Sequence, residues 1–417
     1  MKAVILAAGE GVRMRPLTSN KPKVMLPVAN KPIIEHIVNT LIQAGIKEFI
    51  LVVGYRAEQI EEHFGNGENW GVDIKYIRQE KPTGTADAVA MIEPFVGETF
   101  LVVNGDTLYR LVDIKSMLSL TPPAMGVIQV EGAHGMGVIT REGNFVKSIV
   151  EKASPPPTKT ANAGVYLFDR RIFSAISSVE LSPRGENEIP DAIQLLINRG
   201  ATLRWHELSG WLTFSNPWDL LEGGKWVYTP SMMANLGTVE EGVVIKGEIS
   251  VGQNTTIRSG SYISGPVVIG DNCDIGPNCS LRPFTSIGDG CHVGAFVEIK
   301  NSIIMAGTKV PHITYIGDSV VGEKCNFGAG TQIANLRFDD KNVRVNALDT
   351  GRRKLGAIIG DSVFTGVNAS IDAGTIIGEN SRIGPGIFVH GHIRAGSHIL
   401  RNKLESTTHG SAFDGTE

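Results

Sequence analysis

The second half of the chain carries an aliphatic residue at every sixth position. The unbroken run is Val239, Ile245, Val251, Ile257, Ile263, Ile269, Ile275, Leu281, Ile287, Val293 and Ile299. An amphipathic helix repeats near 3.6 residues and does not produce this period. Because six is a multiple of two, each aliphatic side chain can lie on the inward face of a short strand before the chain turns. The pattern predicts a solenoid of short parallel strands, a β-helix.

Beyond Ile299 the repeat continues with changes of register. It slips by one residue at Ile304 and again at Val321, and after an interruption it resumes at Ile359. Three hexads make one coil of about eighteen residues, so each coil has three sides. Glycine commonly follows the aliphatic residue, where it permits a tight corner. Parallel crossovers are normally right-handed, and the spacing alone shows no other hand.

These repeats resemble the left-handed β-helix of the hexapeptide acyltransferases. The resemblance implies a left-handed parallel β-helix, which we expect over residues 237–405. Residues 406–417 are small and polar, and we expect a disordered tail there.

The first half lacks the six-residue period and alternates strand-like with helix-like segments. Residues 3–7, 49–53 and 100–103 are short apolar runs, whereas 32–44 and 86–95 have helical spacing. This alternation predicts an open, mostly parallel sheet covered on both faces, with ligands bound beyond the carboxyl ends of its strands. We expect a Rossmann-like α/β domain over residues 1–225, followed by a linker at 226–236.

The first strand leads into a glycine-rich segment, Gly9-Glu10-Gly11-Val12-Arg13, and then into Lys21-Pro22-Lys23. Glycines let backbone approach phosphates, and cations neutralise their charge. The glycines alone match neither a Walker A loop nor a dinucleotide fingerprint. Together with the following residues to His36, they closely resemble the signature of the sugar-phosphate nucleotidyltransferases, which join a nucleoside triphosphate to a sugar 1-phosphate and release pyrophosphate.

The resemblance implies a role for each matching position. Gly9 and Gly11 would surround the triphosphate, and Arg13 and Lys23 would act as catalytic cations. Gln79, Gly84 and Thr85 would bind the base of UTP or dTTP. Asp106 would hold Mg²⁺, and the sugar phosphate would be bound by Gly137, Glu151, Lys152 and Asn162.

One position departs from the pattern of this family. Relatives carry a second metal-binding aspartate between two tryptophans, where this chain has Thr213 in the segment from Trp211 to Trp218. A hydroxyl brings no negative charge, and Mg²⁺ in proteins relies on one or two carboxylates together with substrate phosphates. The substitution predicts weak metal binding and slow nucleotidyl transfer.

Polar residues gather where the register of the solenoid slips. His312 lies between two segments with Lys300 and Asn326. Lys300 and Tyr315 are roughly one coil apart, and we expect His312 near both. These stretches resemble the acetyltransferase half of bacterial enzymes that acetylate glucosamine 1-phosphate with acetyl-CoA. The resemblance makes His312 the general base, a task that suits an imidazole because its unperturbed pKa lies near neutral pH. The sugar phosphate would be bound by Arg282, Lys300, Tyr315, Asn326 and Lys341.

A polar insertion interrupts the repeat between Ile333 and Ile359. It carries six cations, namely Arg337, Lys341, Arg344, Arg352, Arg353 and Lys354. Charge runs usually form a solvated loop. Hexapeptide acyltransferases are usually trimers with sites between subunits, so the resemblance implies a homotrimer in which this loop reaches a neighbouring subunit's phosphate or CoA.

Composition excludes several classes of partner. The net charge of −4 gives no general attraction to nucleic acid or an acidic membrane, and no segment is apolar enough to span a bilayer. We therefore expect a cytoplasmic protein. All four cysteines lie four places after a hexad aliphatic residue, so the repeat explains their spacing, and they lack the paired arrangement of a zinc site.

The sequence thus predicts a bifunctional enzyme of sugar-nucleotide biosynthesis. One alternative is a regulatory or assembly subunit that binds sugar nucleotides without turnover, which Thr213 favours. Another is a mannose-1-phosphate guanylyltransferase, which joins the same two folds but does not need the residues around His312.

Overall fold

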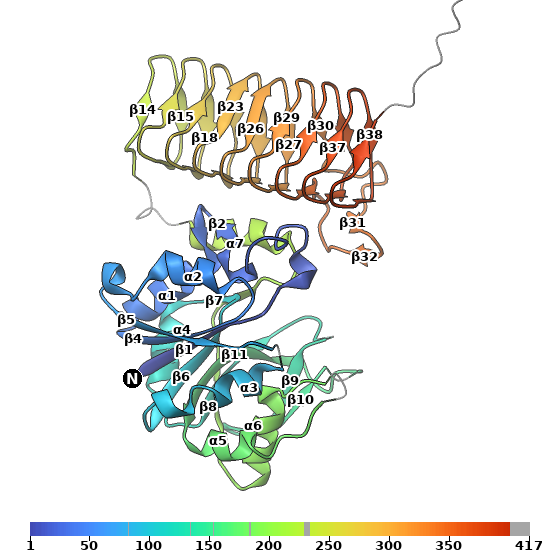
Figure 1. The fold of residues 1–417 in the computed structure, drawn as a ribbon. Helices are drawn as coiled ribbons and strands as arrows, with labels where there is room; N and C mark the ends of the chain where they lie inside the picture. Colours follow the sequence, from blue (N-terminus) through green and yellow to red (C-terminus); the bar gives the residue numbers. More distant parts are fainter. Residues whose placement is uncertain (82, 134, 153, 183–184, 229–233, 401–417) are drawn as a thin grey trace, which may run out of the picture.

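The computed structural model has an α/β domain below a β-helix (Figure 1). It describes residues 1–81, 83–133, 135–152, 154–182, 185–228 and 234–400. The whole of the expected tail, 406–417, and part of the expected linker therefore lie outside the described residues. Within the described residues, no helix is both long and apolar enough to cross a membrane.

The α/β domain is built on one nine-stranded sheet in the order β5-β4-β1-β6-β11-β8-β12-β10-β9. Its strands are β1 (Lys2–Ala7), β4 (Glu48–Val53), β5 (Asp73–Arg78), β6 (Thr99–Asn104), β8 (Ala124–Gln129), β9 (Gly137–Glu142), β10 (Phe145–Glu151), β11 (Thr160–Asp169) and β12 (Arg204–Glu207). The first four strands in that order are parallel, but β11 is antiparallel to β6 and β8, and β10 to β9 and β12. The expectation of a mostly parallel sheet is therefore wrong beyond β6, where β8 and β12 are parallel and the other pairings of the described strands are antiparallel.

Helices cover both faces of this sheet, as expected. One face packs against α1 (Ile33–Gln43), α2 (Ala57–Phe64), α4 (Leu111–Leu118) and α7 (Asp219–Val227). The other face packs against α3 (Thr85–Ala90), α5 (Arg171–Ile176) and α6 (Ile189–Asn198). Two small sheets lie apart from it, β2 (Pro27–Val28) with β3 (Lys31–Pro32), and β7 (Thr107–Tyr109) with β13 (Trp211–Thr213).

The β-helix has three parallel sheets, one along each side. The first contains β14 (Thr238–Val239), β17 (Thr256–Ile257), β20 (Asp274–Ile275), β23 (His292–Ala295), β26 (Lys309–His312), β29 (Asn326–Phe327), β34 (Phe364–Thr365), β37 (Arg382–Ile383) and β40 (His398–Ile399). The second contains β15 (Val244–Lys246), β18 (Tyr262–Ser264), β21 (Ser280–Leu281), β24 (Glu298–Lys300), β27 (Tyr315–Gly317), β30 (Gln332–Ile333), β35 (Ser370–Ile371) and β38 (Phe388–Val389). The third contains β16 (Ile249–Val251), β19 (Val267–Ile269), β22 (Thr285–Ile287), β25 (Ile303–Ile304), β28 (Val320–Val321), β33 (Ile358–Ile359), β36 (Ile376–Ile377) and β39 (His392–Ile393).

The hexad residues fill the interior of the coil. From Val251 to Ile299 every one of them is buried, and so are Ile304, Val321 and Phe327 after the register changes. The four cysteines are also buried, and burial raises the pKa of the Cys291 and Cys325 thiols to about 12. Protonated thiols inside an apolar stack act as small core residues. The structure confirms the packing interpretation of the cysteines.

The third sheet of the β-helix is buried on both of its sides. Its outward positions hold Ile303, Val320, Ile358 and Ile376, which join the same hydrophobic cluster as Met14 and Leu17 of the α/β domain. On the other two sheets most outward residues are at least partly exposed. The third sheet is therefore the surface on which the α/β domain packs.

Polar contacts fix this interface. Lys21 forms an ion pair with Glu323, and the Arg352 guanidinium lies 2.6 Å from the Glu222 carboxylate on α7. The Asn30 amide donates to the Ile287 carbonyl over 2.6 Å. The contact of Arg352 places the insertion between Ile333 and Ile359 partly against the α/β domain of its own chain.

The insertion contains a hairpin of β31 (Arg344–Val345) and β32 (Leu348–Asp349). Val343, Val345 and Leu355 are buried in the shared hydrophobic cluster. This part of the insertion is therefore not a solvated loop, because its apolar residues face inward while its cations alternate with them. Its reach towards a neighbouring subunit stays a prediction.

Candidate functional site

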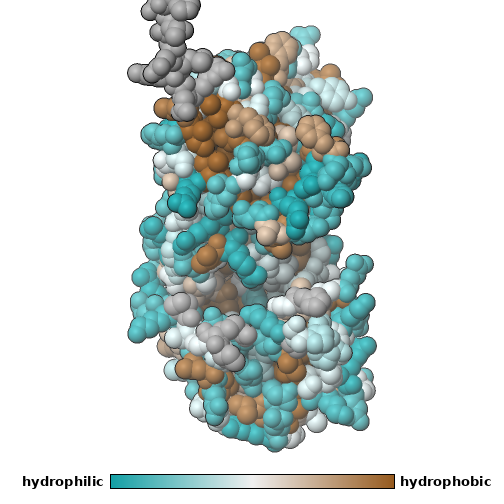
Figure 2. All heavy atoms as spheres, turned by 90° about the vertical axis from the view of Figure 1, so that its right-hand side faces the viewer, coloured by the Kyte–Doolittle hydropathy of each residue, from teal (hydrophilic) through white to brown (hydrophobic). Residues whose placement is uncertain are grey.

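The first candidate site is a cleft at the carboxyl edge of the parallel strands. β1 runs from left to right in Figure 1, so this edge faces the viewer in Figure 2, where the lower domain is hollowed. A cavity of about 270 Å³ lies there, lined by Gly9, Gly11, Lys23, Gln79, Gly84, Thr85 and Asp106 among others. The sequence therefore identified the residues that surround this cavity.

The glycine-rich segment follows β1 directly. Gly11 has a φ of 71°, and a Cβ atom there would lie 2.6 Å from Cβ of Lys23. Any larger residue would be strained in this backbone conformation and would push Lys23 away from the cleft. Gly11 thus lets the lysine segment, with its short 3-10 turn at Lys23–Met25, pack against the loop.

Lys23 forms an ion pair with Asp106, which lies two residues beyond the end of β6. Thr107 donates to Asp106 Oδ1 over 3.2 Å, and its hydroxyl lies 3.2 Å from that of Thr213. β7 and β13 pair Thr107 with Thr213 directly. Thr213, where the resembling family has an aspartate, therefore lies opposite Thr107, the residue that directly follows Asp106.

The expected base-binding residues lie beside the glycine loop. Gln79 is buried, and its Nε2 atom donates to the Gly84 carbonyl over 3.0 Å. Gly84 has a φ of 123°, and its missing Cβ makes room for the backbone of Asn187. The Thr85 hydroxyl accepts a hydrogen bond from the Ile189 N–H over 3.1 Å, which ties α3 to α6.

A second cavity, of about 390 Å³, adjoins the first. It is lined by Arg13, Gly137, Glu151, Lys152, Asn162 and Thr213 among others, and it shares Thr85, Asn104 and Glu186 with the first cavity. Gly137 pairs with Glu151 across β9 and β10, and Asn162 donates to the Tyr166 hydroxyl over 2.6 Å. All the residues expected for nucleotide, metal and sugar thus line two connected cavities.

Sequence reasoning missed three residues of this cleft. Asn104 ends β6, and Glu186 is exposed at the boundary of the two cavities. Tyr166 is buried, and burial raises the pKa of its phenol above the ordinary value. A polar residue at a strand end was the available signal for Asn104, whereas Glu186 lies in a loop that does not directly follow a strand of the sheet.

The second candidate site lies on the β-helix. His312 ends β26 and is exposed, and its imidazole forms no hydrogen bond or ion pair with any residue that the structure describes. The next residue, Ile313, has a φ of 40° and is 57% exposed. A β-branched residue rarely adopts this left-handed conformation, so the corner that presents His312 is conformationally strained.

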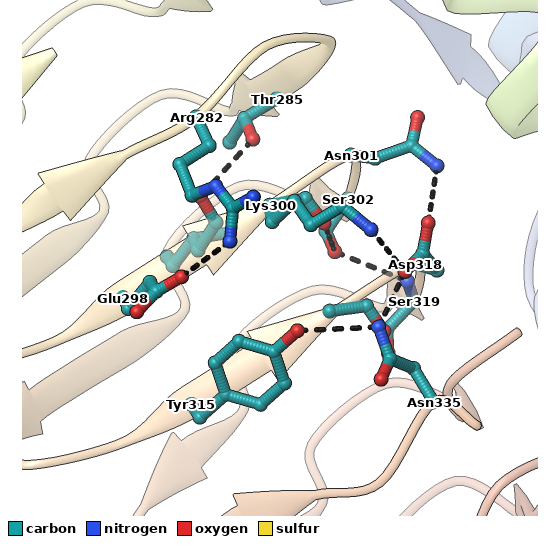
Figure 3. Close-up of polar contacts among 12 residues, drawn as sticks. Arg282, Thr285, Glu298, Lys300, Asn301, Ser302, Tyr315, Asp318, Ser319 and Asn335 are labelled. Carbon is teal, nitrogen blue, oxygen red and sulfur yellow. Dashed lines mark hydrogen bonds and ion pairs between the residues drawn. The ribbon is translucent and has the colours of Figure 1, made fainter. Parts of the chain in front are cut away.

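A polar cluster lies at the next corner of the same coil (Figure 3). The Asp318 carboxylate accepts hydrogen bonds from Lys300 Nζ at 2.8 Å, Asn301 Nδ2 at 2.7 Å and Asn335 Nδ2 at 2.5 Å. Asn335 Nδ2 also lies 3.2 Å from the Tyr315 hydroxyl. The structure therefore joins two expected sugar-site residues, Lys300 and Tyr315, through two that were not predicted as site residues, Asp318 and Asn335.

The remaining expected residues of this site lie around that cluster. Arg282 forms an ion pair of 2.7 Å with Glu298, the residue directly beside Tyr315 in the sheet. Asn326 lies on the first sheet, one coil beyond Lys309. Lys341 is exposed in the insertion. Among the described residues, no hydrogen bond or ion pair connects His312, Asn326 or Lys341 to the Lys300 cluster.

Burial and nearby charges change the pKa of the Tyr315 phenol. Burial raises its pKa above the ordinary value, and the nearby carboxylates of Asp318 and Glu298 raise it further. The phenol therefore stays protonated at neutral pH and can donate a hydrogen bond.

The residues around Asp106 fit a magnesium ion that arrives with substrate phosphates. Asp106 supplies one carboxylate and Thr213 a nearby hydroxyl. Among the residues that the structure describes, no group of three or more histidine, cysteine, aspartate or glutamate side chains could hold a metal on its own. One carboxylate with phosphate oxygens is within the ordinary range for Mg²⁺.

Comparison with known proteins assigns both halves. The nucleotidyl transferase family model matches residues 2–229, the GMPPB C-terminal domain matches 263–349, and the hexapeptide repeat of succinyl-transferase matches 356–390. A solved structure, a putative glucose-1-phosphate thymidylyltransferase from Bacillus anthracis, aligns with a TM-score of 0.50 and 29% identity, covering 54% of this chain and 94% of that one. The matches agree with the expected fold class, an α/β nucleotidyltransferase domain followed by a left-handed β-helix.

Two relatives cover nearly the whole chain. The bifunctional protein GlmU of Methanocaldococcus jannaschii is 39% identical over 96% of this chain and 98% of its own length. The bifunctional sugar-1-phosphate nucleotidylyltransferase/acetyltransferase of Sulfurisphaera tokodaii is 38% identical over 94% of this chain and 97% of its own length. With this identity over nearly the whole chain and both halves matched, the chain belongs to the family of bifunctional sugar-1-phosphate nucleotidylyltransferases/acetyltransferases, the GlmU-type proteins.

Proposed function

We propose that the β-helix, over residues 237–405, acetylates glucosamine 1-phosphate or galactosamine 1-phosphate with acetyl-CoA. The α/β domain, over residues 1–225, would then transfer a nucleotidyl group from UTP or dTTP to N-acetylglucosamine 1-phosphate, or to glucose 1-phosphate. The observation that carries this proposal is the presence of two separate polar clusters in one chain. One has Lys23 paired to Asp106, and the other has Lys300 paired to Asp318, one corner of the coil beyond the exposed His312.

Nucleotidyl transfer is an in-line displacement. An oxygen of the sugar phosphate attacks the α-phosphorus, the bond from that phosphorus to the bridging oxygen breaks, and pyrophosphate leaves. The charge that spreads over the phosphoryl oxygens must meet cations that are already in place. Arg13 and Lys23 line the cavities where these oxygens would lie. When bound, Mg²⁺ supplies further positive charge, with Asp106 as the protein ligand.

Other residues of the cleft would orient the two substrates. Gly9 and Gly11 leave room for the triphosphate, and Gln79, Gly84 and Thr85 form the part of the cavity nearest the base. Gly137, Glu151, Lys152 and Asn162 would hydrogen-bond the sugar in the adjoining cavity. Lys23 is held by Asp106, so its ammonium is fixed before the triphosphate binds.

Acetyl transfer needs a base at the β-helix. The sugar amine attacks the thioester carbonyl, the carbon–sulfur bond breaks, and the thiol of CoA leaves. His312 would remove the proton that the attacking amine loses, because its imidazole is exposed and has no competing partner among the described residues. Arg282, Lys300, Tyr315, Asn326 and Lys341 would bind the sugar phosphate. A homotrimer, usual for hexapeptide acyltransferases, would bring a second chain to the exposed side of His312.

One assay separates this proposal from its alternatives. The protein is given glucosamine 1-phosphate with acetyl-CoA, and separately N-acetylglucosamine 1-phosphate with UTP, dTTP or GTP, and thiol and pyrophosphate release are measured. Release of thiol in the first reaction and of pyrophosphate with UTP or dTTP is expected. Neither product would favour a binding subunit, and pyrophosphate with only GTP and mannose 1-phosphate would favour a guanylyltransferase.

A further inference from the structure

Asp318 is a buried carboxylate outside the set of residues that we expect, from the resemblance, to serve acetyl transfer. It lies at the corner between β27 and β28, is 4% exposed and has a φ of 51°. Aspartate and asparagine tolerate this left-handed conformation better than most residues. The turn itself therefore accounts for a small polar residue but not for a charge.

Equivalent corners in the two preceding coils show that the fold does not require a carboxylate. The N–H of Phe284 donates to Pro266, that of Asn301 to Pro283, and that of Asp318 to Lys300, each bond crossing to the coil before. Phe284 and Asn301 also have positive φ angles, of 63° and 45°. A neutral residue therefore makes the same corner twice, and the charge of Asp318 needs another explanation.

The contacts of Asp318 supply one. A buried carboxylate is costly unless it is paired and hydrogen-bonded, and here one ammonium and two amides surround it. The Lys300 side chain is 20% exposed and 2.8 Å away, and Asn335 Nδ2 is 2.5 Å away. Figure 3 shows both groups pointing to Asp318 from neighbouring coils, with Tyr315 beside Asn335.

We propose that Asp318 is the positioning residue of the amino-sugar-phosphate site. Its carboxylate holds the Lys300 ammonium and the Asn335 amide in fixed places, so that the substrate phosphate meets a cation that is already oriented. An ammonium has three N–H donors, and one bond to Asp318 leaves two for the phosphate. Fixing such groups in advance removes an entropic cost from substrate binding. This inference rests on the proposed acetyl transfer at His312.

Asp318→Asn tests the proposal, because asparagine keeps the size and the turn conformation while removing the charge. We expect kcat/KM for acetylation of glucosamine 1-phosphate to fall roughly 10- to 100-fold, mainly through the KM of the sugar phosphate. The KM of acetyl-CoA and the rate of pyrophosphate release should stay unchanged. Asp289→Asn is the matched control, since Asp289 is another corner carboxylate of the β-helix and accepts a hydrogen bond from the Asp271 N–H.

A double variant decides whether Asp318 acts through the lysine. Adding Asp318→Asn to Lys300→Met should cost little more than Lys300→Met alone, because the two residues work as one unit. Additive losses, an unchanged KM for the sugar phosphate, or an equal rise in both KM values would overturn the proposal. Absence of thiol release from the parent protein would instead refute the proposed function, so the two failures are distinguishable.

A second variant guards against a folding defect. Pyrophosphate release and the melting temperature report folding of the same chain. If Asp318→Asn does not fold, Asn301→Gly removes one of the three donors at a residue whose φ is already positive. It should raise the KM of the sugar phosphate several-fold and leave that of acetyl-CoA unchanged. No change in the KM of the sugar phosphate would count against the proposal.

Discussion

The two candidate sites of this chain are built by opposite means. The nucleotidyl site is a cleft within one domain, where strand ends, a glycine loop and a hairpin surround connected cavities of about 270 and 390 Å³. The acetyl site lies on an outer surface of a regular coil, and His312 is exposed at its corner. The edge of a sheet can form an enclosed site within one chain. On a regular coil, a site forms where the residues at the corners differ from those of the neighbouring coils.

The two sites also differ in how their charges are held. Lys23 and Asp106 are both partly exposed in the cleft, with side-chain exposures of 14% and 28%. On the β-helix the carboxylate of Asp318 is almost fully buried beneath a lysine that is 20% exposed. In the cleft, both the Lys23 ammonium and the Asp106 carboxylate are therefore accessible to substrate. On the β-helix, only the Lys300 ammonium of the pair is accessible.

The largest expected effect is on the β-helix side. His312→Ala removes the general base and should lower acetyl transfer by about 10²- to 10⁴-fold. Thiol release from acetyl-CoA measures the loss, and pyrophosphate release should not change. His292→Ala is the control, because His292 lies on the neighbouring strand of the same sheet, opposite Lys309, with its ring 3.4 Å from the Asp274 carboxylate. A fully active His312→Ala would remove this histidine from the mechanism.

The corresponding change in the cleft is Lys23→Gln. Loss of the ammonium removes one preorganised charge from the transition state, and nucleotidyl transfer should fall by about 10²- to 10³-fold. Pyrophosphate release measures it, with acetyl transfer as the unaffected reference. Lys31→Gln provides a matched lysine that pairs with Glu35 outside the cleft. Equal losses in both activities would show a folding defect rather than the expected separation.

A third variant tests the coil that carries the second site. Ile299 is the central residue of β24, between Glu298 and Lys300 in the sequence, and its side chain is fully buried. Ile299→Ala should lower the free energy of unfolding by about 2–5 kcal/mol. Phe296→Ala, at an exposed corner of the same coil, should change it by less than about 0.5 kcal/mol. Denaturant unfolding compares the two. Similar losses would contradict the assignment of the hexad residues to the core.

The smallest expected effect concerns Thr213. Thr213→Asp restores a second carboxylate beside Asp106 and should lower the Mg²⁺ concentration for half-maximal pyrophosphate release several-fold. Magnesium titration of the parent and the variant at fixed UTP measures this. An equal Mg²⁺ requirement in both proteins would show that one carboxylate suffices in this cleft. It would contradict the prediction that Thr213 weakens metal binding and slows nucleotidyl transfer.

Local sequence patterns predicted the parts of the fold that repeat or follow a motif. The hexad run predicted the interior of the coil, and the segment from Gly9 to Lys23 predicted one wall of the cleft. The antiparallel half of the sheet was not predicted, although the two-residue loop Gly143-Asn144 between β9 and β10 is a sequence signal for a hairpin.

These local patterns could not predict contacts between residues that lie far apart in the sequence. Asp318 was missed because a buried carboxylate depends on Lys300 and Asn335, which come from other coils. The interface between the domains, in contrast, could have been predicted from a pattern in the sequence. Paired aliphatics, such as Ile303-Ile304 and Ile358-Ile359, recur on one sheet of the coil and indicate a strand buried on both sides.

Mixing the two single-site variants tests the central claim that one chain carries two independent chemistries. His312→Ala and Lys23→Gln are each incubated with glucosamine 1-phosphate, acetyl-CoA and UTP or dTTP, alone and together, and the N-acetylated sugar nucleotide is measured by mass. Each variant alone should make almost none, and the mixture should make it because N-acetylglucosamine 1-phosphate passes from one protein to the other. A mixture that stays inactive, or a single variant that forms the product at the parent's rate, would contradict the account.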